Sequence, residues 1–317
     1  MSGHALHQVI AIPRNGYINR LQAWASAAIL ADVLDVPARL LWEPEAAAPT
    51  GADELFDPGF LGECQISRAE VDALLGRDHQ ELPRYLHALH DRGVIVLAGH
   101  DRGEQVFMSQ LQDMLAAERT MTSFVIIAGG KFHLPATVDF EQARRDFYRS
   151  LQWSTSVESR VQDELKGREP FLAVHVRQTD RALTAPTARS MRSALSELHE
   201  HTHITPVFVA ADTAQARDQW QSIARSMGLD PWSSAAKSHD RGSASGGVDA
   251  MVDWRILTAA QGLVYSAESS FGQEAAVAIG SRDRTVGLTA SGSLQRARTT
   301  ARLAHAALTY PRRRLGR

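Results

Sequence analysis

Short apolar runs alternate along the chain with longer segments in which apolar residues recur at helical spacing. The short runs are rich in β-branched and aromatic residues, a composition that predicts buried strands. These predicted strands span residues 9–12, 39–42, 94–97, 124–127, 171–176, 207–211, 263–265 and 285–288. Their alternation with helical segments is the signature of βα units that feed a parallel sheet.

The longer segments predict helices that follow the strands. In residues 19–34, NRLQAWASAAILADVL, alanine supplies helix propensity and the apolar positions keep to one helical face. Those positions are Leu21, Ala25, Ala28, Ile29 and Val33. Further helices are predicted at residues 214–227, 249–260, 271–279 and, near the end of the chain, 291–308. The predicted fold class is therefore α/β with parallel sheets.

A charged segment of helical period, residues 140–168, separates the two sets of strands. With 317 residues the chain is long enough for two domains, and we place them at residues 1–150 and 151–317. The last predicted helix either stays with the second domain or crosses back over the first. Residues 43–54 and 233–247 predict loops from their Pro, Gly and Ser content, and the second loop is either a lid or a plain connection.

Composition narrows the class of protein. Hydrophobic residues make up 44% and charged residues 22% of the chain, which is ordinary for a soluble globular protein. The net charge of −2 excludes a global field that would hold nucleic acid or anionic lipid, and the basic stretch 310–317 predicts a solvated terminus. Cys64 is the single cysteine and forms no intramolecular disulfide. With no apolar run of about 20 residues and no signal-peptide pattern, the sequence predicts a cytoplasmic protein.

The stretch FLAVHVRQTDR, residues 171–181, begins as a buried strand and ends in charge. Alternation places His175 and Arg177 on one face of the strand, at the carboxyl edge of the sheet, where open α/β folds bind ligands. The guanidinium of Arg177 needs acceptors, and a phosphate or diphosphate satisfies it with two strong bonds. A structural ion pair with Asp180 or a more distant carboxylate is the alternative that this segment alone leaves open.

A second candidate anion site follows the predicted strand at residues 263–265. There a serine-rich turn opens a helix, and Ser269 or Ser270 is a natural N-cap. A helix start presents unpaired N–H groups and a partial positive charge, which favour an anion, although plain capping without a ligand is the alternative. No D-x-D sequence occurs in the chain, so a diphosphate would be neutralised by protein donors and not by a metal clamp.

Three pieces of the sequence together resemble one family of enzymes. Residues 15–21, NGYINRL, are similar to the family's glycine turn and N/D-R-L, ahead of an Ala-rich helix and a strand ending in Trp42. HVRQTDR is similar to its H-x-R-x-T-D-K/R, and the third piece joins Asp212, Asp253 and the serine turn. The family is that of the fucosyltransferases, with the N-glycan core α-1,6 enzymes and the rhizobial nodulation enzymes, and with the protein O-fucosyltransferases as more distant relatives.

The resemblance implies a GT-B fold, in which two Rossmann-like domains face a cleft and the second domain holds most of the nucleotide sugar. It implies an inverting glycosyltransferase without a metal or other cofactor, which moves fucose or a related hexose from a GDP-sugar to a hydroxyl acceptor. Arg177 would stabilise the charge that grows on the departing GDP, an interaction needed most in the transition state. Arg177 and Asp180 are accordingly the catalytic candidates.

By the same resemblance, a wider set of residues binds the donor. The set comprises Asn19, Arg20, His175, Asp212, Asp253, Ser269, Ser270 and Phe271. Asn19 and Arg20 would close over the diphosphate or sugar, and the two serines would contact phosphate. His175 would lie against the nucleotide. Asp253 would accept hydrogen bonds from guanine or hold the architecture, while Asp212 has either a nucleotide contact or a structural role.

The sequence departs from the family on the acceptor side. In the N-glycan core enzymes, an acid five positions after the motif aspartate is thought to deprotonate the acceptor, and here that position is Ala185. The acid that usually precedes the next strand is Gln261. The base is therefore elsewhere, or is Asp180, or is made unnecessary by easy departure of GDP. Two other functions stay open: a GT-B transferase with another nucleotide sugar, and a non-catalytic nucleotide- or sugar-binding protein.

Two motifs point to chemistry that we do not expect. HEHTH, residues 199–203, has three histidines in a predicted linker, but no matched cysteine or carboxylate spacing that would make a metal site. Residues 128–131, AGGK, lack the spacing and the hydroxyl of a phosphate-binding loop, which excludes a Walker-type ATP site.

Overall fold

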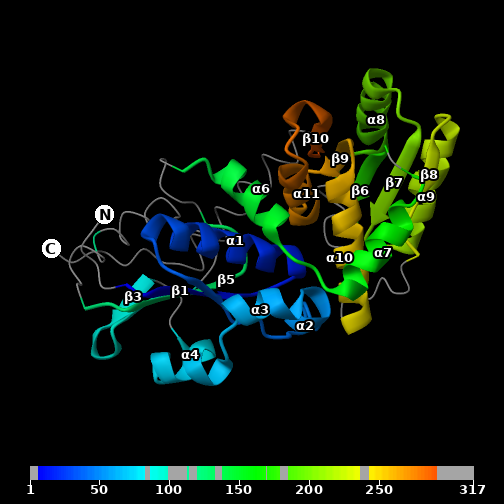
Figure 1. Cartoon of the computed structure of the whole chain (residues 1–317). Coiled ribbons are helices and arrows are strands. Elements are labelled where there is room, and N and C mark those ends of the chain that lie inside the picture. Colours follow the sequence, from blue (N-terminus) through cyan, green and yellow to red (C-terminus); the bar gives the residue numbers. More distant parts are fainter. Residues whose placement is uncertain are drawn as a thin grey trace. The chain divides into compact units, whose positions relative to one another are not determined.

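The structure is a computed structural model, and it describes residues 6–82, 86–98, 113, 120–132, 138–168, 170–178, 185–235 and 243–290 (Figure 1). The described chain forms two compact units. Unit 1 draws on residues 6–168, 234–259 and 274–280, and unit 2 on residues 170–233, 260–273 and 281–290. The predicted helix at 291–308, the basic stretch 310–317 and Asp180 all lie outside the described residues.

Unit 1 is built on a mixed sheet in the order β2-β1-β5-β4-β3. Its strands are β1 (Gln8–Pro13), β2 (Ala38–Leu40), β3 (Leu86–Leu89), β4 (Val94–Ala98) and β5 (Ser123–Ala128). All neighbours are parallel except β3, which pairs antiparallel with β4 at one edge. Ile10 and Ile12 of β1 share a buried cluster with Val71 and Leu75, while Val9 on the opposite face is also buried. Both faces of this sheet are therefore covered, as parallel sheets require.

The helices of unit 1 begin at residues that suit a helix start. They are α1 (Tyr17–Leu34), α2 (Ala52–Leu55), α3 (Pro58–Cys64), α4 (Arg68–Leu75), α6 (Phe140–Ser150), α7 (Thr155–Leu165) and α10 (Ala244–Ala259), with short 3-10 turns η1 (His79–Glu81) and η2 (His90–Arg92). Ser67 and Glu70 form a capping box on α4, and Asp57, Asp139 and Ser154 cap α3, α6 and α7. None of the described helices has the length and apolar content that a membrane span requires.

Unit 2 holds an all-parallel sheet in the order β10-β9-β6-β7-β8. Its strands are β6 (Leu172–Val176), β7 (Pro206–Ala211), β8 (Asp230–Trp232), β9 (Gly262–Ser266) and β10 (Thr285–Leu288). Helices α8 (Ala188–Thr202) and α9 (Ala214–Ser226) follow β6 and β7, η3 (Arg282–Arg284) precedes β10, and α11 (Ser270–Ile279) begins in this unit. Leu172, Val174 and Val176 pack in one apolar cluster with Leu195 and Trp220 of these helices. The predicted α/β class with parallel-rich sheets is confirmed.

Every strand predicted from the sequence is present, but three local predictions were wrong. HEHTH is not a linker: it forms the last turn of α8, where His199 Nδ1 lies 2.8 Å from the Ile204 carbonyl and His203 is the left-handed C-cap. The predicted loops were too long, because α2 begins at Ala52 and α10 begins at Ala244. Strands β3 and β8 were missed because their sequences, LHAL and DPW, lack the β-branched residues that mark the other strands.

Candidate functional site

The carboxyl ends of three neighbouring strands define the candidate site of unit 2. Strand β6 lies between β7 and β9 and runs parallel to both, so the ends of the three strands meet at one edge of the sheet. This is the edge at which open α/β sheets bind ligands. His175, Asp212 and Ser266 stand at or next to these strand ends, one on each strand or the residue after it.

His175 and Phe271 are brought together at this edge. The two rings stack, with centroids 5.1 Å apart and an angle of 22° between the planes. His175 is buried on β6 and Phe271 lies in the first turn of α11, so the contact joins the strand to the helix start. Both residues were predicted to bind the donor, and the structure brings their rings into contact.

The turn from β9 into α11 holds two buried hydroxyl groups. Ser266 is 4% and Ser269 is 2% exposed, and neither Oγ has a hydrogen-bond partner within the part of the chain that the structure describes. The Ser269 carbonyl accepts from the Gln273 N–H at 3.0 Å, which places Ser269 at the start of α11. Buried hydroxyls without partners are uncommon, and beside a helix N-terminus they are suited to an anion. Ser266 was missed by the sequence analysis, although a serine ending an apolar strand was visible there.

A close approach of the backbone also shapes this turn. A Cβ added to Gly272 would lie 2.7 Å from the Cβ of Tyr265 on β9, which is too close for any larger residue. The first turn of α11 therefore sits directly against its preceding strand. This packing keeps the N-terminal N–H groups of the helix at the sheet edge.

Arg177 and Asp212 lie in the segments that leave β6 and β7. Arg177 is partly exposed at the end of β6. The Gln178 N–H donates to both carboxylate oxygens of Asp212, at 3.0 and 3.1 Å, and the Asp212 N–H donates to the Val176 carbonyl at 3.3 Å. Because Asp180 falls outside the described residues, its predicted catalytic role and its pairing with Arg177 stay predictions.

In unit 1, Arg20 is held by protein groups. It is fully buried; its Nε donates to the Asn15 carbonyl at 2.9 Å and its Nη1 to the Glu43 carbonyl at 2.6 Å. Its Nη2 lies 3.2 Å from Glu45 Oε2, and its guanidinium covers the Trp42 ring at 5.0 Å. Burial lowers the pKa of Arg20, while the carboxylate of Glu45 opposes that shift. Arg20 thus builds the turn after β1.

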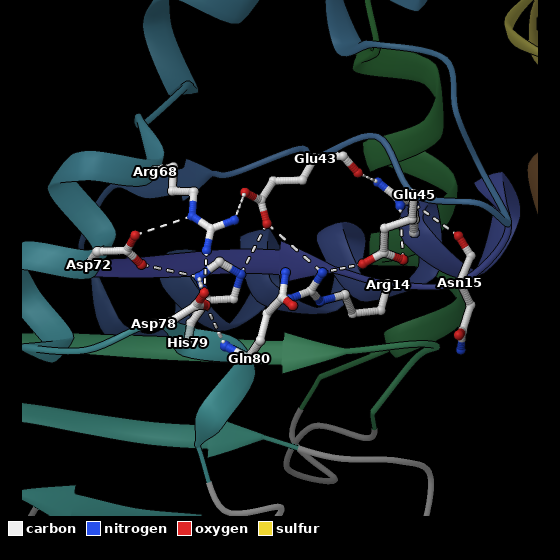
Figure 2. A network of polar contacts seen from close by, with 10 residues as sticks. Arg14, Asn15, Glu43, Glu45, Arg68, Asp72, Asp78, His79 and Gln80 are labelled. Carbon is white, nitrogen blue, oxygen red and sulfur yellow. Dashed lines mark hydrogen bonds and ion pairs between the residues drawn. The ribbon is translucent and has the colours of Figure 1, made fainter.

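A network of charged groups lies beside this turn (Figure 2). Glu43, just after β2, joins His79 of η1 at 3.0 Å and Arg68 of α4 at 3.3 Å. His79 is buried and its Nδ1 lies 3.3 Å from Asp72, while Arg68 also pairs with Asp78 at 2.6 Å. The ligand-type atoms of Asp72, Asp78 and His79 lie within 4.8 Å of one another, but Arg68 already balances the carboxylates.

The network continues toward the end of β1. Arg14 forms ion pairs with Glu45 and, at 3.9 Å, with Glu43 (Figure 2). Asn15 donates from Nδ2 to the Gly129 carbonyl at 3.2 Å. Asn15 has a φ of 68°, in the left-handed region that asparagine tolerates. The sequence analysis missed Arg14 and Glu43, although charges directly after apolar strands were the visible signal. Asn19 is partly exposed on α1 and stays a predicted ligand contact.

Asp253 is a partly buried acid on α10 in unit 1. The Ser234 hydroxyl donates to its Oδ1. Burial raises the pKa of Asp253 to about 7, the carboxylates of Asp249 and Glu164 raise it further, and Ser234 and Arg160 oppose the shift. A pKa near neutrality marks candidate functional acids as well as structural ones, and the predicted guanine contact stays a prediction.

Glu274 of α11 is a buried acid that the sequence analysis missed. Its carboxylate is fully buried and receives donors from several elements of unit 1. Gln22 Nε2 donates to Oε1 at 2.6 Å, the Tyr148 hydroxyl donates to Oε2 at 2.8 Å, and Arg144 forms an ion pair with the same oxygen. Lys131, from the AGGK segment, lies 3.6 Å from Oε1. Burial and the nearby charge of Glu274 raise the pKa of Tyr148 well above its usual range.

The fold is similar to that of solved fucosyltransferases, although no family model and no curated protein sequence matches the chain. A NodZ alpha-1,6-fucosyltransferase soaked with GDP-fucose aligns with a TM-score of 0.56 and 17% identity, over 86% of this chain and 92% of that one. FUT1 of Arabidopsis thaliana in complex with GDP aligns at 0.57 and 16%, over 86% and 68%. POFUT1 in complex with GDP-fucose aligns at 0.51 and 12%, over 90% and 99%. The expected GT-B fold class is confirmed.

Proposed function

We propose that this chain is a glycosyltransferase that moves fucose, or a related hexose, from a GDP-sugar to a hydroxyl acceptor, with inversion and without a metal. The observation that supports it best is the edge of the unit 2 sheet, where Arg177 follows β6 and the buried hydroxyls of Ser266 and Ser269 lie at the end of the neighbouring strand β9 and at the start of α11. The shared fold with enzymes that hold GDP or GDP-fucose in their structures adds to this support.

In the proposed reaction, the bond from the sugar carbon to the β-phosphate oxygen breaks as the acceptor oxygen attacks from the opposite face. Arg177 and the first N–H groups of α11 stabilise the negative charge that develops on GDP, which lowers the barrier because this charge is greatest in the transition state. The stacked rings of His175 and Phe271 form the surface against which the donor lies. The acceptor proton leaves to Asp180, to another base or directly to solvent.

Residues of unit 1 have proposed roles that follow from their placement. Arg20 keeps the shape of the turn after β1, because protein groups occupy its guanidinium. Asn19 contacts the donor or acceptor, and Asp253 holds α10 or meets the guanine. A reducing, cytoplasmic location is part of the proposal, because the single cysteine, Cys64, has no second cysteine with which to form an intramolecular disulfide. Cell fractionation would test the location.

Thermal melting with a panel of nucleotides in EDTA tests the donor. A ligand at 100 times its Kd adds about 2.7 kcal/mol to the free energy of unfolding, enough for a clear rise in the melting midpoint. We expect GDP and GDP-fucose to raise the midpoint while UDP and NAD leave it unchanged. A rise with UDP and none with GDP would make the donor assignment wrong.

Turnover tests the role of Arg177. We expect Arg177→Ala to lower kcat by about two to three powers of ten, the scale seen when one preorganised donor is removed. Arg192→Ala is the matched control, because Arg192 is exposed on α8, the next helix of the same unit. A near-normal kcat for Arg177→Ala would remove this residue from the mechanism.

A non-catalytic nucleotide- or sugar-binding protein is the second candidate, and Ala185 is the observation in its favour. A protein that kept the donor pocket and lost the acceptor base would bind GDP-fucose without turnover. Slow release of fucose from GDP-fucose by the wild-type protein, lowered by about two to three powers of ten in Arg177→Ala, would decide for the enzyme. Tight binding with no hydrolysis and no transfer to any tested acceptor would decide for the binding protein.

A further inference from the structure

The segment that leaves β6 is attached to the end of β7 at two points. The ladder between the strands ends at the pair Val176 and Ala211, beyond which strand pairing no longer holds the backbone. There the Val176 carbonyl accepts from the Asp212 N–H at 3.3 Å, and the Asp212 carboxylate accepts from the Gln178 N–H at 3.0 and 3.1 Å. Asp212 thus continues the hydrogen bonding between β6 and β7 beyond the last strand pair, as far as Gln178.

Arg177 lies between these two points. Because the peptide before it and the peptide after it are both hydrogen-bonded to Asp212, the directions of its Cα–Cβ bond and of the side chain are restricted. A hydrogen bond from an N–H to a carboxylate is charge-assisted and about twice as strong as one between neutral groups. The carboxylate of Asp212 would also repel a diphosphate at this edge. Its presence here is therefore better explained by the hydrogen bond that it accepts from the Gln178 N–H.

We propose that Asp212 is a positioning residue, which holds the peptide after Arg177 and so directs the guanidinium toward the leaving diphosphate. This inference relies on the proposed function for the role of Arg177. The sequence left two roles open for Asp212, a nucleotide contact or a structural role, and this inference assigns it the structural role. Asp212 then acts on the reaction only through Arg177, and it needs an acceptor oxygen for this purpose more than it needs a negative charge.

A double-mutant cycle tests the dependence on Arg177. We expect Asp212→Ala to lower kcat for hydrolysis of GDP-fucose by about ten- to a hundredfold, since a displacement of about 1 Å can cost a factor of 10². In the Arg177→Ala background, the same change should lower kcat by less than about threefold, because coupled residues are not additive. If the two losses multiply, Asp212 acts independently and the inference is wrong.

The conservative variant separates positioning from charge. Asp212→Asn keeps one acceptor oxygen for the Gln178 N–H, so we expect kcat within about fivefold of wild type at an unchanged melting midpoint. Asp218→Ala, which removes an exposed acid from α9 in the same unit, is the matched control. A loss in Asp212→Asn as large as in Asp212→Ala would show that the charge itself is needed and would overturn the proposal.

Amide hydrogen exchange of the ligand-free protein tests the anchor without any donor. The Gln178 N–H should be protected in wild type and in Asp212→Asn, and should exchange at least about tenfold faster in Asp212→Ala, whereas the amides of β6 stay protected. Equal exchange in all three proteins would overturn the positioning role, whatever the reaction is. The three proteins could show the expected pattern of Gln178 exchange while the wild type neither binds nor turns over GDP-fucose. That result would refute only the proposed function.

Discussion

Asp253 leads to a quantitative prediction of how the stability of the protein depends on pH. Asp253 is partly buried on α10, and the loss of contact with water raises the pKa of its carboxyl group to about 7 from the ordinary value of 3.8. Between these two pH values the folded protein keeps a proton that the unfolded chain has lost. The free energy of unfolding therefore falls as pH rises from about 4 to about 7, and it levels off above that range.

The magnitude follows from the size of the shift. A displacement from 3.8 to about 7, at about 1.4 kcal/mol for each pH unit, makes the ionised form cost about 4 kcal/mol at most. About 3 kcal/mol of this cost appears between pH 5 and pH 8. Asp253→Asn removes the ionisation while its side-chain oxygen still accepts from the Ser234 hydroxyl. Between pH 5 and pH 8, the free energy of unfolding of the wild type should therefore fall by about 3 kcal/mol relative to that of Asp253→Asn.

Urea denaturation at pH 5, 6, 7 and 8, at constant ionic strength, measures this difference. Tryptophan fluorescence is a suitable signal, because the adjacent Trp254 is buried in the same helix. Asp163→Asn, an exposed acid on α7, is the control and should leave the pH dependence unchanged. Parallel pH profiles for wild type and Asp253→Asn would refute the reasoning, because they would mean that this carboxyl titrates alike in the folded and unfolded states.

Two further substitutions test the packing of unit 1. Gly247→Ala should lower the melting midpoint, because the added Cβ would lie 1.9 Å from Thr50 Oγ1 and overpacking costs about 1–3 kcal/mol. Gly62→Ala is the control: Gly62 faces open space on α3, so the melting midpoint should stay unchanged or rise. Glu274→Gln should cost about 3–5 kcal/mol in urea denaturation, because it leaves the buried Arg144 without its carboxylate. An unchanged midpoint in either case would contradict the described contacts.

Much of the fold was predictable, because the signals that define it are local. The apolar runs marked the long parallel strands, and the helical spacing of residues 19–34 marked α1 to within two residues of its start. Two short strands, β3 and β8, were not predictable in this way. Strand β3 has four residues and is defined by its antiparallel pairing with β4, which depends on where the chain returns and not on its own composition.

The sequence pointed to candidate site residues by their place at strand ends and helix starts, and their functional roles stay predictions. His175, Arg177 and Phe271 were identified by their place in such patterns, and the stacking of the two rings is consistent with that reading. Arg20 shows what tertiary structure adds to the same reasoning. Its position in a motif pointed to a ligand, and the fold surrounds it with the Asn15 and Glu43 carbonyls and Trp42, so its contact with the donor stays a prediction.

By itself, the sequence determined the class of elements, their order and the residues that stand at strand ends, because the periods of helices and strands are written in neighbouring residues. Only the tertiary structure decided which charges meet. Glu43 finds His79 across 36 positions, and Glu274 finds Gln22 across 252. Such partners follow from the packing of whole elements, and the burial that gives each charge its pKa and its energetic weight exists only once those elements have come together.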